Sequence, residues 1–200
     1  VAIDGVSGAD ATEDGTQSVT ITITENESSP TITLATSATS IAENAGSSLT
    51  LTATSSIVAD EDITISFSTS GTGTEGTDYS TISNITISAG ATTGTTTFTP
   101  TDDSIYEGNE TGIVAIDTVS GADAAESGSQ SVTITITENE SAPTVTLATS
   151  ATSIAENAGS SLTLTATLSV ATTADVTVGI STSGTGTEGT DYATISDITI

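Results

Sequence analysis

The sequence predicts an all-β fold in which antiparallel β-sandwiches are repeated in tandem. Three observations carry this prediction. Threonine alternates with apolar residues over long stretches, which is typical of strands with one buried face. The threonine, isoleucine and valine in these stretches are β-branched and favour strands, and no apolar pattern has a period of 3.6 residues. The chain also repeats itself at a spacing that suits one sandwich domain.

The repeat has a period of 113 residues, because Val1 matches Val114 and Pro30 matches Pro143 without a gap between them. This period is too long for a solenoid unit and has the size of a small domain. We expect the natural chain to continue in both directions. The expected divisions are the C-terminal strands of one repeat at 1–27, a complete repeat at 28–140, and the N-terminal strands of the next repeat at 141–200.

Seven strands are expected in the complete repeat. In the last of them, Val132, Ile134 and Ile136 face one way and the threonines between them face the other. Residues 113–116 are apolar on both faces, which predicts a central strand. Glycine, serine, asparagine and aspartate fill the gaps, and seven short strands in one repeat are typical of an immunoglobulin-like sandwich. The strands are expected near 31–36, 48–54, 62–68, 80–87, 94–100, 111–118 and 130–138.

The charge of the chain excludes several classes of function. There are 26 acidic residues and no lysine, arginine or histidine, so the net charge is −26. A polyanion is not attracted to nucleic acid or to an anionic membrane surface. The absence of an apolar run of spanning length predicts no membrane insertion in this segment. Without cysteine, histidine or lysine most acid–base and nucleophilic machinery is missing, and we do not expect an enzyme.

The segment 101–110 gathers four acidic residues in a predicted loop, and the chain has no basic residue to balance them. Adjacent carboxylates repel one another, which raises their pKa values unless a cation lies between them. Ligands that are all oxygen favour calcium over zinc or copper, so the loop predicts a calcium site. The alternative is a solvated acidic turn. The four residues are Asp102, Asp103, Glu107 and Glu110.

The order of the strands predicts which loops meet. If successive strands run up and down, Glu43, the loop 71–78, the loop 102–107 and the exit segment 138–140 lie at one end of the sandwich. Acidic residues far apart in the sequence then converge where the chain leaves the domain, and they offer the six to eight oxygens, roughly, that calcium takes. The opposite end would hold 55–61, 88–93 and 119–129.

Four segments of the repeat resemble motifs of the Calx-β family, in the same order. They are Ser40-Ile-Ala-Glu-Asn44, Glu75-Gly-Thr-Asp-Tyr79, Asp102–Glu110 and Ile134–Glu140. Calx-β domains are seven-stranded sandwiches that bind calcium at one end, so the resemblance implies calcium as the cofactor, with one to three ions per complete domain. Such domains occur in sodium–calcium exchangers and as tandem arrays in large secreted bacterial surface proteins. Near-identical copies without cationic residues look most like the bacterial arrays.

The resemblance also implies a set of calcium ligands, which lie in the four motifs. In the exit segment, Asn139 stands where the exchanger domains have an acidic residue, which leaves the number of bound ions open. The implied ligands are Glu43, Asp78, Asp102, Asp103, Glu107, Glu138 and Glu140 in the complete repeat, Glu156 and Asp191 in the following copy, and Glu25 and Glu27 in the preceding one.

The tandem copies and the short linkers before Pro30 and Pro143 favour a structural function. We expect a calcium-binding repeat of a long extracellular adhesin or filament, in which calcium at the domain junctions stiffens a head-to-tail array. The expected partners are neighbouring repeats, with filament self-assembly as an extension, and the expected location is outside a bacterial cell or on its surface. The alternative is a calcium-sensing or ligand-binding module of a surface protein, with a glycan or ice as the ligand.

Overall fold

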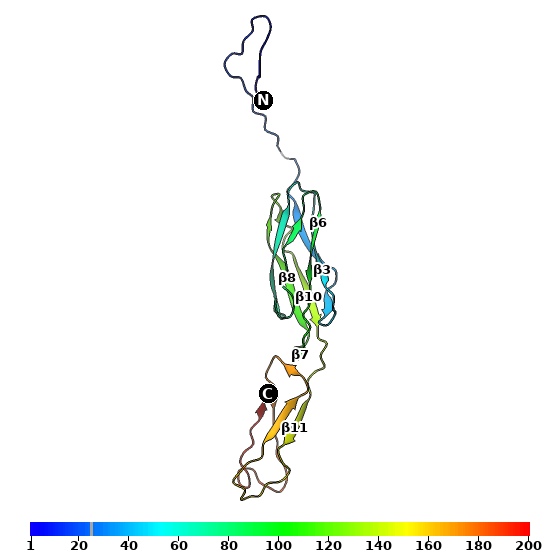
Figure 1. The fold of residues 1–200 in the computed structure, drawn as a ribbon, viewed down its shortest axis with the longest axis vertical. Helices are drawn as coiled ribbons and strands as arrows, with labels where there is room; N and C mark the ends of the chain where they lie inside the picture. The colour runs from blue at the N-terminus through cyan, green and yellow to red at the C-terminus, as the bar shows by residue number, and fades with distance from the viewer. Residues whose placement is uncertain (25) are drawn as a thin grey trace.

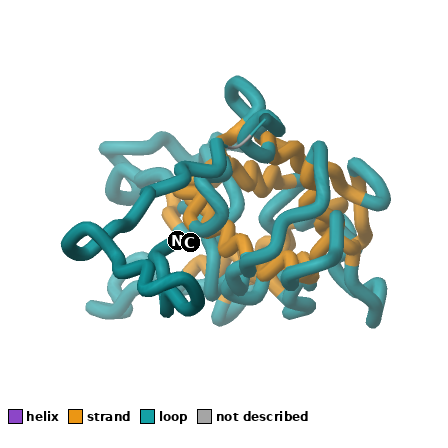
Figure 2. The backbone as a smooth tube through the Cα atoms, turned by 90° about the horizontal axis from the view of Figure 1, so that it is seen from above, coloured by secondary structure: helices purple, strands orange, loops and turns teal. Residues whose placement is uncertain are grey.

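The computed structural model describes residues 1–24 and 26–200. The described residues form strands and loops, with no helix among them (Figure 2). Three parts follow one another along the long axis of the molecule: an extended N-terminal segment, a closed sandwich and a C-terminal part (Figure 1). No helix in the described ranges is long and apolar enough to cross a membrane. The all-β fold predicted from the alternation is confirmed.

The first sheet of the sandwich contains four strands in the order β6-β3-β1-β9. β1 (Thr31–Thr36) pairs antiparallel with β3 (Leu49–Ser55), which pairs antiparallel with β6 (Thr93–Phe98). The short strand β9 (Ala125–Glu126) lies parallel to β1 at the edge. Apolar residues alternate with threonine along β1 and β3, so one face of this sheet is buried and the other is covered with hydroxyl groups.

The second sheet contains five strands in the order β2-β10-β8-β4-β5. β8 (Glu110–Ser120) lies at the centre, between β10 (Ser131–Thr137) and β4 (Ile63–Gly71), as its two apolar faces predicted. β5 (Ile85–Ile87) pairs antiparallel with β4, and β2 (Ser40–Ala42) pairs parallel with β10. The two sheets bury one shared core between them.

Among the differences from the expected strands, two concern the chain around β5 and β2. The strand expected at 80–87 begins only at Ile85, because the N–H of Ile82 donates to the Glu75 carboxylate at 2.6 Å and not to a strand neighbour. β2 was not expected, since three residues are too few for alternation to be visible. After β1 the chain crosses to the other sheet, where Ser40 lies opposite Thr135 of β10.

The core is built from the apolar residues of the alternating strands. Ile65, Phe98 and Ile134 are inaccessible to solvent, and Ile116 is buried. Phe67 and Val132 are half-buried and pack against this core from its margin, as do six other residues. The buried side chains are Ile32, Leu34, Ile41, Leu51, Ala53, Ile63, Ile65, Tyr79, Ile82, Ile85, Ile87, Phe98, Val114, Ile116, Ile134 and Ile136.

An aromatic pair closes the core below the loops 71–78 and 101–110. Tyr79 stacks on Phe98 with 4.6 Å between the ring centroids, and Tyr79 is fully buried where we would expect a half-buried ring beside an acidic loop. Gly112 lies under the pair, and a Cβ atom there would meet the Phe98 ring at 2.8 Å. Only glycine fits this position of β8 without moving the ring.

The terminal parts show what closure of the sandwich buries. In the N-terminal segment Val1 and Val19 exchange backbone hydrogen bonds at 2.8 Å, as expected of two paired strands. Ile23 is 94% exposed there, whereas Ile136 at the same place in the complete repeat is 3% exposed. The C-terminal part pairs β11 (Val145–Thr149) with β12 (Leu164–Leu168), and β14 (Thr177–Val178) with β15 (Ile198–Thr199).

A short strand pairing joins the sandwich to the C-terminal part. β7 (Ile105–Tyr106) belongs to the acidic loop 101–110, and β13 (Ala171–Thr172) belongs to the following repeat. The two strands are parallel, with Ala171 opposite Ile105 and Thr172 opposite Tyr106. The acidic loop therefore lies at the junction between successive repeats.

Candidate metal centre

Side chains continue to alternate between the inward and outward directions beyond the ends of β2 and β10. This alternation turns acidic side chains toward the end of the core. Ile41 of β2 is buried, and two residues later Glu43 is only 7% exposed. Ile136 of β10 is buried, and two residues later Glu138 is half-buried. Because residues i and i+2 share a face, each carboxylate extends an inward-facing row of apolar side chains.

Seven carboxylates gather at this end of the sandwich in three overlapping groups of three, within each of which the candidate ligand atoms lie within 4.8 Å of one another. Glu43 belongs to two of the groups and Glu107 to two, so the groups form one continuous acidic centre. The groups are Glu43–Glu138–Glu140, Glu43–Asp103–Glu107 and Asp78–Glu107–Glu110.

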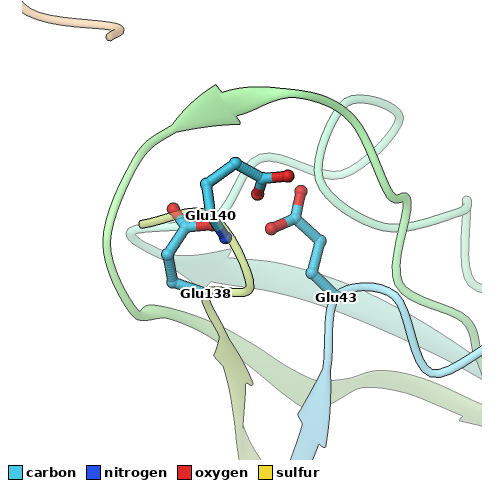
Figure 3. Close-up of side chains that lie close together, drawn as sticks. All are labelled: Glu43, Glu138 and Glu140. Atoms are coloured by element: carbon cyan, nitrogen blue, oxygen red, sulfur yellow. The ribbon is translucent and has the colours of Figure 1, made fainter. Parts of the chain in front are cut away.

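Figure 3 shows the first group. The carboxylates of Glu43 and Glu140 point toward one another, although Glu43 follows β2 and Glu140 lies on the exit segment. The Oε2 atom of Glu140 is buried and has no hydrogen-bond partner in the described part of the chain. A buried carboxylate oxygen without a partner is costly, so this atom is suited to a bound cation.

Glu138 fixes the acidic loop to the exit segment. Its carboxylate accepts hydrogen bonds from the backbone N–H groups of Glu107 at 2.6 Å, Gly108 at 2.8 Å, Asn139 at 2.9 Å and Glu140 at 3.0 Å. Burial opposes the charge of Glu138, but these donors outweigh it and lower its pKa to about 2. The side chain therefore stays ionised and holds two separate segments together.

Two aspartates shape the loops that carry them. The Asp103 carboxylate accepts a hydrogen bond from the N–H of Ile105 at 2.7 Å, and Asp78 accepts one from the N–H of Thr74 at 2.6 Å. Both are local side-chain-to-backbone bonds of the kind that stabilises turns. Each bond uses one oxygen of its carboxylate and turns the loop so that the side chain joins the acidic centre.

The other carboxylates are held in an environment that disfavours their charge. Burial, then the nearby Glu138, raises the pKa of Glu43 to about 7. Burial, then Asp78 and Glu107, raises the pKa of Glu110 to about 7. The pKa of Glu107 is raised as well, by burial and by Asp78. Like charges that are brought together and desolvated behave in this way when no positive charge lies among them.

Calcium fits this donor set. All the candidate ligands are oxygens, the chain has no basic side chain, and the orphaned Oε2 of Glu140 marks a point where an ion would complete the contacts. Calcium takes roughly six to eight oxygen ligands in flexible geometry, which carboxylates on several loops can supply. Soft or imidazole ligands, which favour zinc or copper, are absent from the sequence.

The structure brings together six of the residues that the sequence singled out, namely Glu43, Asp78, Asp103, Glu107, Glu138 and Glu140. Asp102 is exposed outside the three groups, although its charge contributes to the raised pKa of Glu140. Glu156 and Asp191 line one groove of the C-terminal part. Glu27 lines a groove at the opposite end of the sandwich, and Glu25 lies outside the described residues.

Glu110 was missing from the set of expected ligands, although it belongs to the same loop. It is the first residue of β8 and joins Asp78 and Glu107 in the third group. The signal that finds it is the alternation, because Glu110 shares the inward face of β8 with Gly112 and the buried Val114.

Three solved structures are similar to this chain over about half of its length. A search of curated proteins gave no significant match. Among solved structures, the apo form of the Calx CBD1 domain is 15% identical, with a TM-score of 0.46, and the match covers 55% of this chain and 99% of that one. CBD12 from CALX1.2 is 14% identical, with a TM-score of 0.46, over 54% of this chain and 44% of that one. The calcium binding domain CBD12 of CALX1.1 is 16% identical, with a TM-score of 0.44, over 52% and 45%.

A family comparison covers more of the sequence. The model of the Calx-beta domain matches residues 25–140 and again residues 138–198. The two matches overlap only in the exit segment and together span most of the chain. The first takes in the whole closed sandwich and its acidic centre, and the second takes in the C-terminal part. The chain therefore belongs to the Calx-beta domain family.

Proposed function

We propose that this chain is a calcium-binding structural repeat of a long extracellular adhesin or filament. Calcium ions at the ends of successive sandwiches stiffen a head-to-tail array of repeats. The observation that supports this function best is the acidic centre, in which seven carboxylates converge beside the next repeat without a basic residue anywhere in the chain. The proposed location is outside a bacterial cell or on its surface.

Each group of the centre has a distinct part in this proposal. Glu43 and Glu107 are shared between groups, so they are suited to bridge neighbouring ions. Glu140 contributes its free oxygen, and Glu138, whose carboxylate already accepts four backbone hydrogen bonds, positions the others. A bound ion would supply the positive charge that the chain lacks and remove the repulsion that raises the pKa values.

The position of the centre explains how an ion would act on the array. Glu138 and Glu140 lie on the exit segment itself, directly before Pro143 and β11. Asp103 and Glu107 flank β7, which pairs with β13 of the following repeat. Ions held by both sets of residues would fix the linker and the acidic loop together, and so fix the angle between two sandwiches.

Calcium titration by calorimetry, with thermal unfolding in parallel, tests this proposal. We expect calcium to bind and to raise the melting temperature of the chain, because a ligand that binds only the folded state stabilises it. Asp103→Asn with Glu107→Gln should abolish most of the shift, whereas Asp60→Asn with Glu61→Gln, at the opposite end, should leave it unchanged. A melting temperature that does not respond to calcium or to a chelator contradicts the proposal.

A further inference from the structure

The main chain of the acidic loop pairs with the following repeat. Ala171 lies opposite Ile105 and Thr172 opposite Tyr106, in parallel register. In Figure 1, β7 lies at the end of the sandwich that faces the C-terminal part. A strand that adds to the edge of another unit in this way gains its affinity from backbone hydrogen bonds, whatever side chains it carries.

The complete repeat has a segment that corresponds to β13, and within the described residues no strand pairs with that segment. The 113-residue register places Val58 and Ala59 where the next repeat has Ala171 and Thr172. In the part of the chain that the structure describes, neither the N–H nor the C=O of Val58 has a hydrogen-bond partner. Val58 is 58% exposed and Ile57 is 37% exposed, so two adjacent apolar side chains lie open to solvent at this segment.

This segment borders a groove that the incoming linker enters. The groove has a volume of about 940 Å³ and is lined by residues 27–30, 57–61 and 119–124. At the next junction, the equivalent loop, with β13, is contacted by the acidic loop of the preceding sandwich. The linker before Pro30 has the same length as the linker before Pro143, so it would bring the acidic loop of a preceding copy to the groove beside Val58.

We propose that residues 57–59 form a docking edge for the Ile-Tyr segment in the acidic loop of another copy of the repeat. That segment is the equivalent of Ile105–Tyr106, and it pairs with Val58 and Ala59 in parallel, as β7 pairs with β13. Successive repeats are then joined twice, by the covalent linker and by a two-residue β-pairing. The second contact uses main-chain groups, so it does not depend on the assignment of calcium ligands.

The differences between the two copies fit a contact made by the main chain. Residues 57–61 differ from residues 170–174 at every position, whereas residues 41–50 are identical to residues 154–163. If the Ile-Tyr segment recognised side chains, residues 57–61 and 170–174 could not differ at every position and both bind it. Pairing through N–H and C=O groups tolerates these substitutions, because every residue except proline offers both groups.

The segments 57–61 and 170–174 differ in charge, so the acidic loop should dock on them with different strength. Asp60 and Glu61 stand beside the groove where the following repeat has Thr173 and Ala174. The approaching loop 101–110 is itself acidic, so like charges oppose docking at residues 57–59. Exposed charges are screened over about 10 Å at 0.1 M salt and about 30 Å at 0.01 M, so this docking strengthens as the salt concentration rises.

An extended chain tests the inference. Residues 28–113 are duplicated ahead of Val1, which restores the 113-residue register and supplies an Ile-Tyr segment in front of the groove. Residue-resolved amide hydrogen exchange is then compared with the original chain in 0.5 M salt. We expect exchange at residues 57–59 to slow by about tenfold, the effect of one or two net hydrogen bonds. Unchanged exchange there, with residues 105–106 and 171–172 protected, overturns the inference.

Two sets of variants sharpen the test. In the extended chain, Asp60→Thr with Glu61→Ala replaces the two acidic residues by those found at positions 173 and 174. Protection of the amides of residues 57–59 should then no longer depend on the salt concentration. In the original chain, Ala171→Pro removes a donor from β13, disrupts its pairing with β7 and should speed exchange at the amide of Tyr106. The amide of Ile105 donates to the Asp103 carboxylate and should stay protected. Val58→Pro is the matched control in that chain and should leave the Tyr106 amide unchanged. Equal effects of the two prolines contradict the pairing.

The calcium response of the same samples separates this inference from the proposed function. Protection at residues 57–59 without a calcium-dependent melting temperature overturns the calcium function and leaves the docking edge in place. A calcium response without protection overturns the docking edge and leaves the calcium function in place.

Discussion

Glu43 combines burial, a carboxylate and the absence of any basic neighbour. It belongs to two of the three acidic groups, and its pKa is raised to about 7 by burial and by Glu138. In a metal-free protein such a residue destabilises the folded state when it is ionised. As a ligand in the proposed calcium site, the same residue would contribute oxygens to the ion. A single side chain would then have opposite effects on stability in the two states.

The effect of Glu43→Gln on the melting temperature should change sign when calcium is added. Without calcium, loss of the buried charge should raise the melting temperature by about 2–8 °C, the shift expected for roughly 1 kcal/mol in a domain of this size. With calcium in excess, the variant should be less stable than the original chain, because a ligand is lost. Calorimetry in chelator and in calcium measures both, with Glu61→Gln as the exposed control. A variant that is destabilised to the same extent in both conditions contradicts the assignment.

The pH dependence of the calcium-free protein follows from the same residues. The folded pKa values of Glu43 and Glu110, about 7, lie above the ordinary value of 4.5, so the folded state binds more protons between these two pH values. Stability should therefore fall as the pH rises from about 4.5 to 7. Glu138, with its pKa lowered to about 2, acts in the opposite direction only below about pH 4.5.

Chemical denaturation of the chelated protein at pH 5 and pH 7.5 measures this difference. The protein should be more stable at pH 5, and the difference should shrink in excess calcium, because a bound cation keeps the carboxylates ionised. Stability that rises with pH over this window in chelator would contradict the raised pKa values.

At the scale of the element, long alternating strands were predictable and short ones were not. β1 occupies the expected residues, since its apolar and threonine positions alternate throughout. β2 and β7 have three and two residues, which is too short for any period to show. Their partners in β10 and β13 lie 95 and 66 residues away in the sequence, so the local sequence does not indicate which strands pair.

The acidic centre was predictable to a similar degree, and for the same reason. Counting strand directions places Glu43, Asp78, Glu107 and the exit segment at one end of the sandwich, and the structure gathers them there. The count does not say which side chains turn inward. Asp102 and Asp103 are both exposed, but only Asp103 joins the centre, and its carboxylate also accepts a hydrogen bond from the N–H of Ile105.

Leu51 tests the core that the alternation predicts. It lies in the middle of β3 and is inaccessible to solvent, so Leu51→Ala removes packed methyl groups and leaves a cavity. The free energy of unfolding should fall by about 2–5 kcal/mol. Thr54→Ala, at an exposed position of the same strand, is the control and should change it by roughly 0.5 kcal/mol or less. Urea denaturation measures both, and equal losses would show that the register is wrong.

At the scale of the whole molecule, the three parts lie in a line, with the acidic centre of the sandwich at its junction with the C-terminal part (Figure 1). The linker before Pro143 is short, and proline restricts it further. Without an ion, the carboxylates on the exit segment and the acidic loop repel one another. In the proposed function, bound ions remove this repulsion and hold the linker and the loop in one arrangement.

Small-angle X-ray scattering of the chain should therefore depend on calcium. We expect a longer and more sharply defined maximum dimension in calcium, and a shorter, broader distribution of distances in chelator. Asp103→Asn with Glu107→Gln should give the chelator profile in both conditions. A chain that is already freely jointed in calcium, or equally extended in chelator, would contradict the stiffening function.

The direction of the strands has a consequence for a chain under tension. The strands of the sandwich run along the long axis, and the two linkers leave from its opposite ends (Figure 1). A pull transmitted through the array therefore acts on β1 and β10 along their own lengths. The hydrogen bonds that tie β1 to β3 and β10 to β8 lie across that direction, so they are loaded in shear and share the force, whereas bonds that are peeled from one end break one after another. Each sandwich is thus oriented to resist extension, and the first element to yield under load should be the two-residue pairing of β7 with β13.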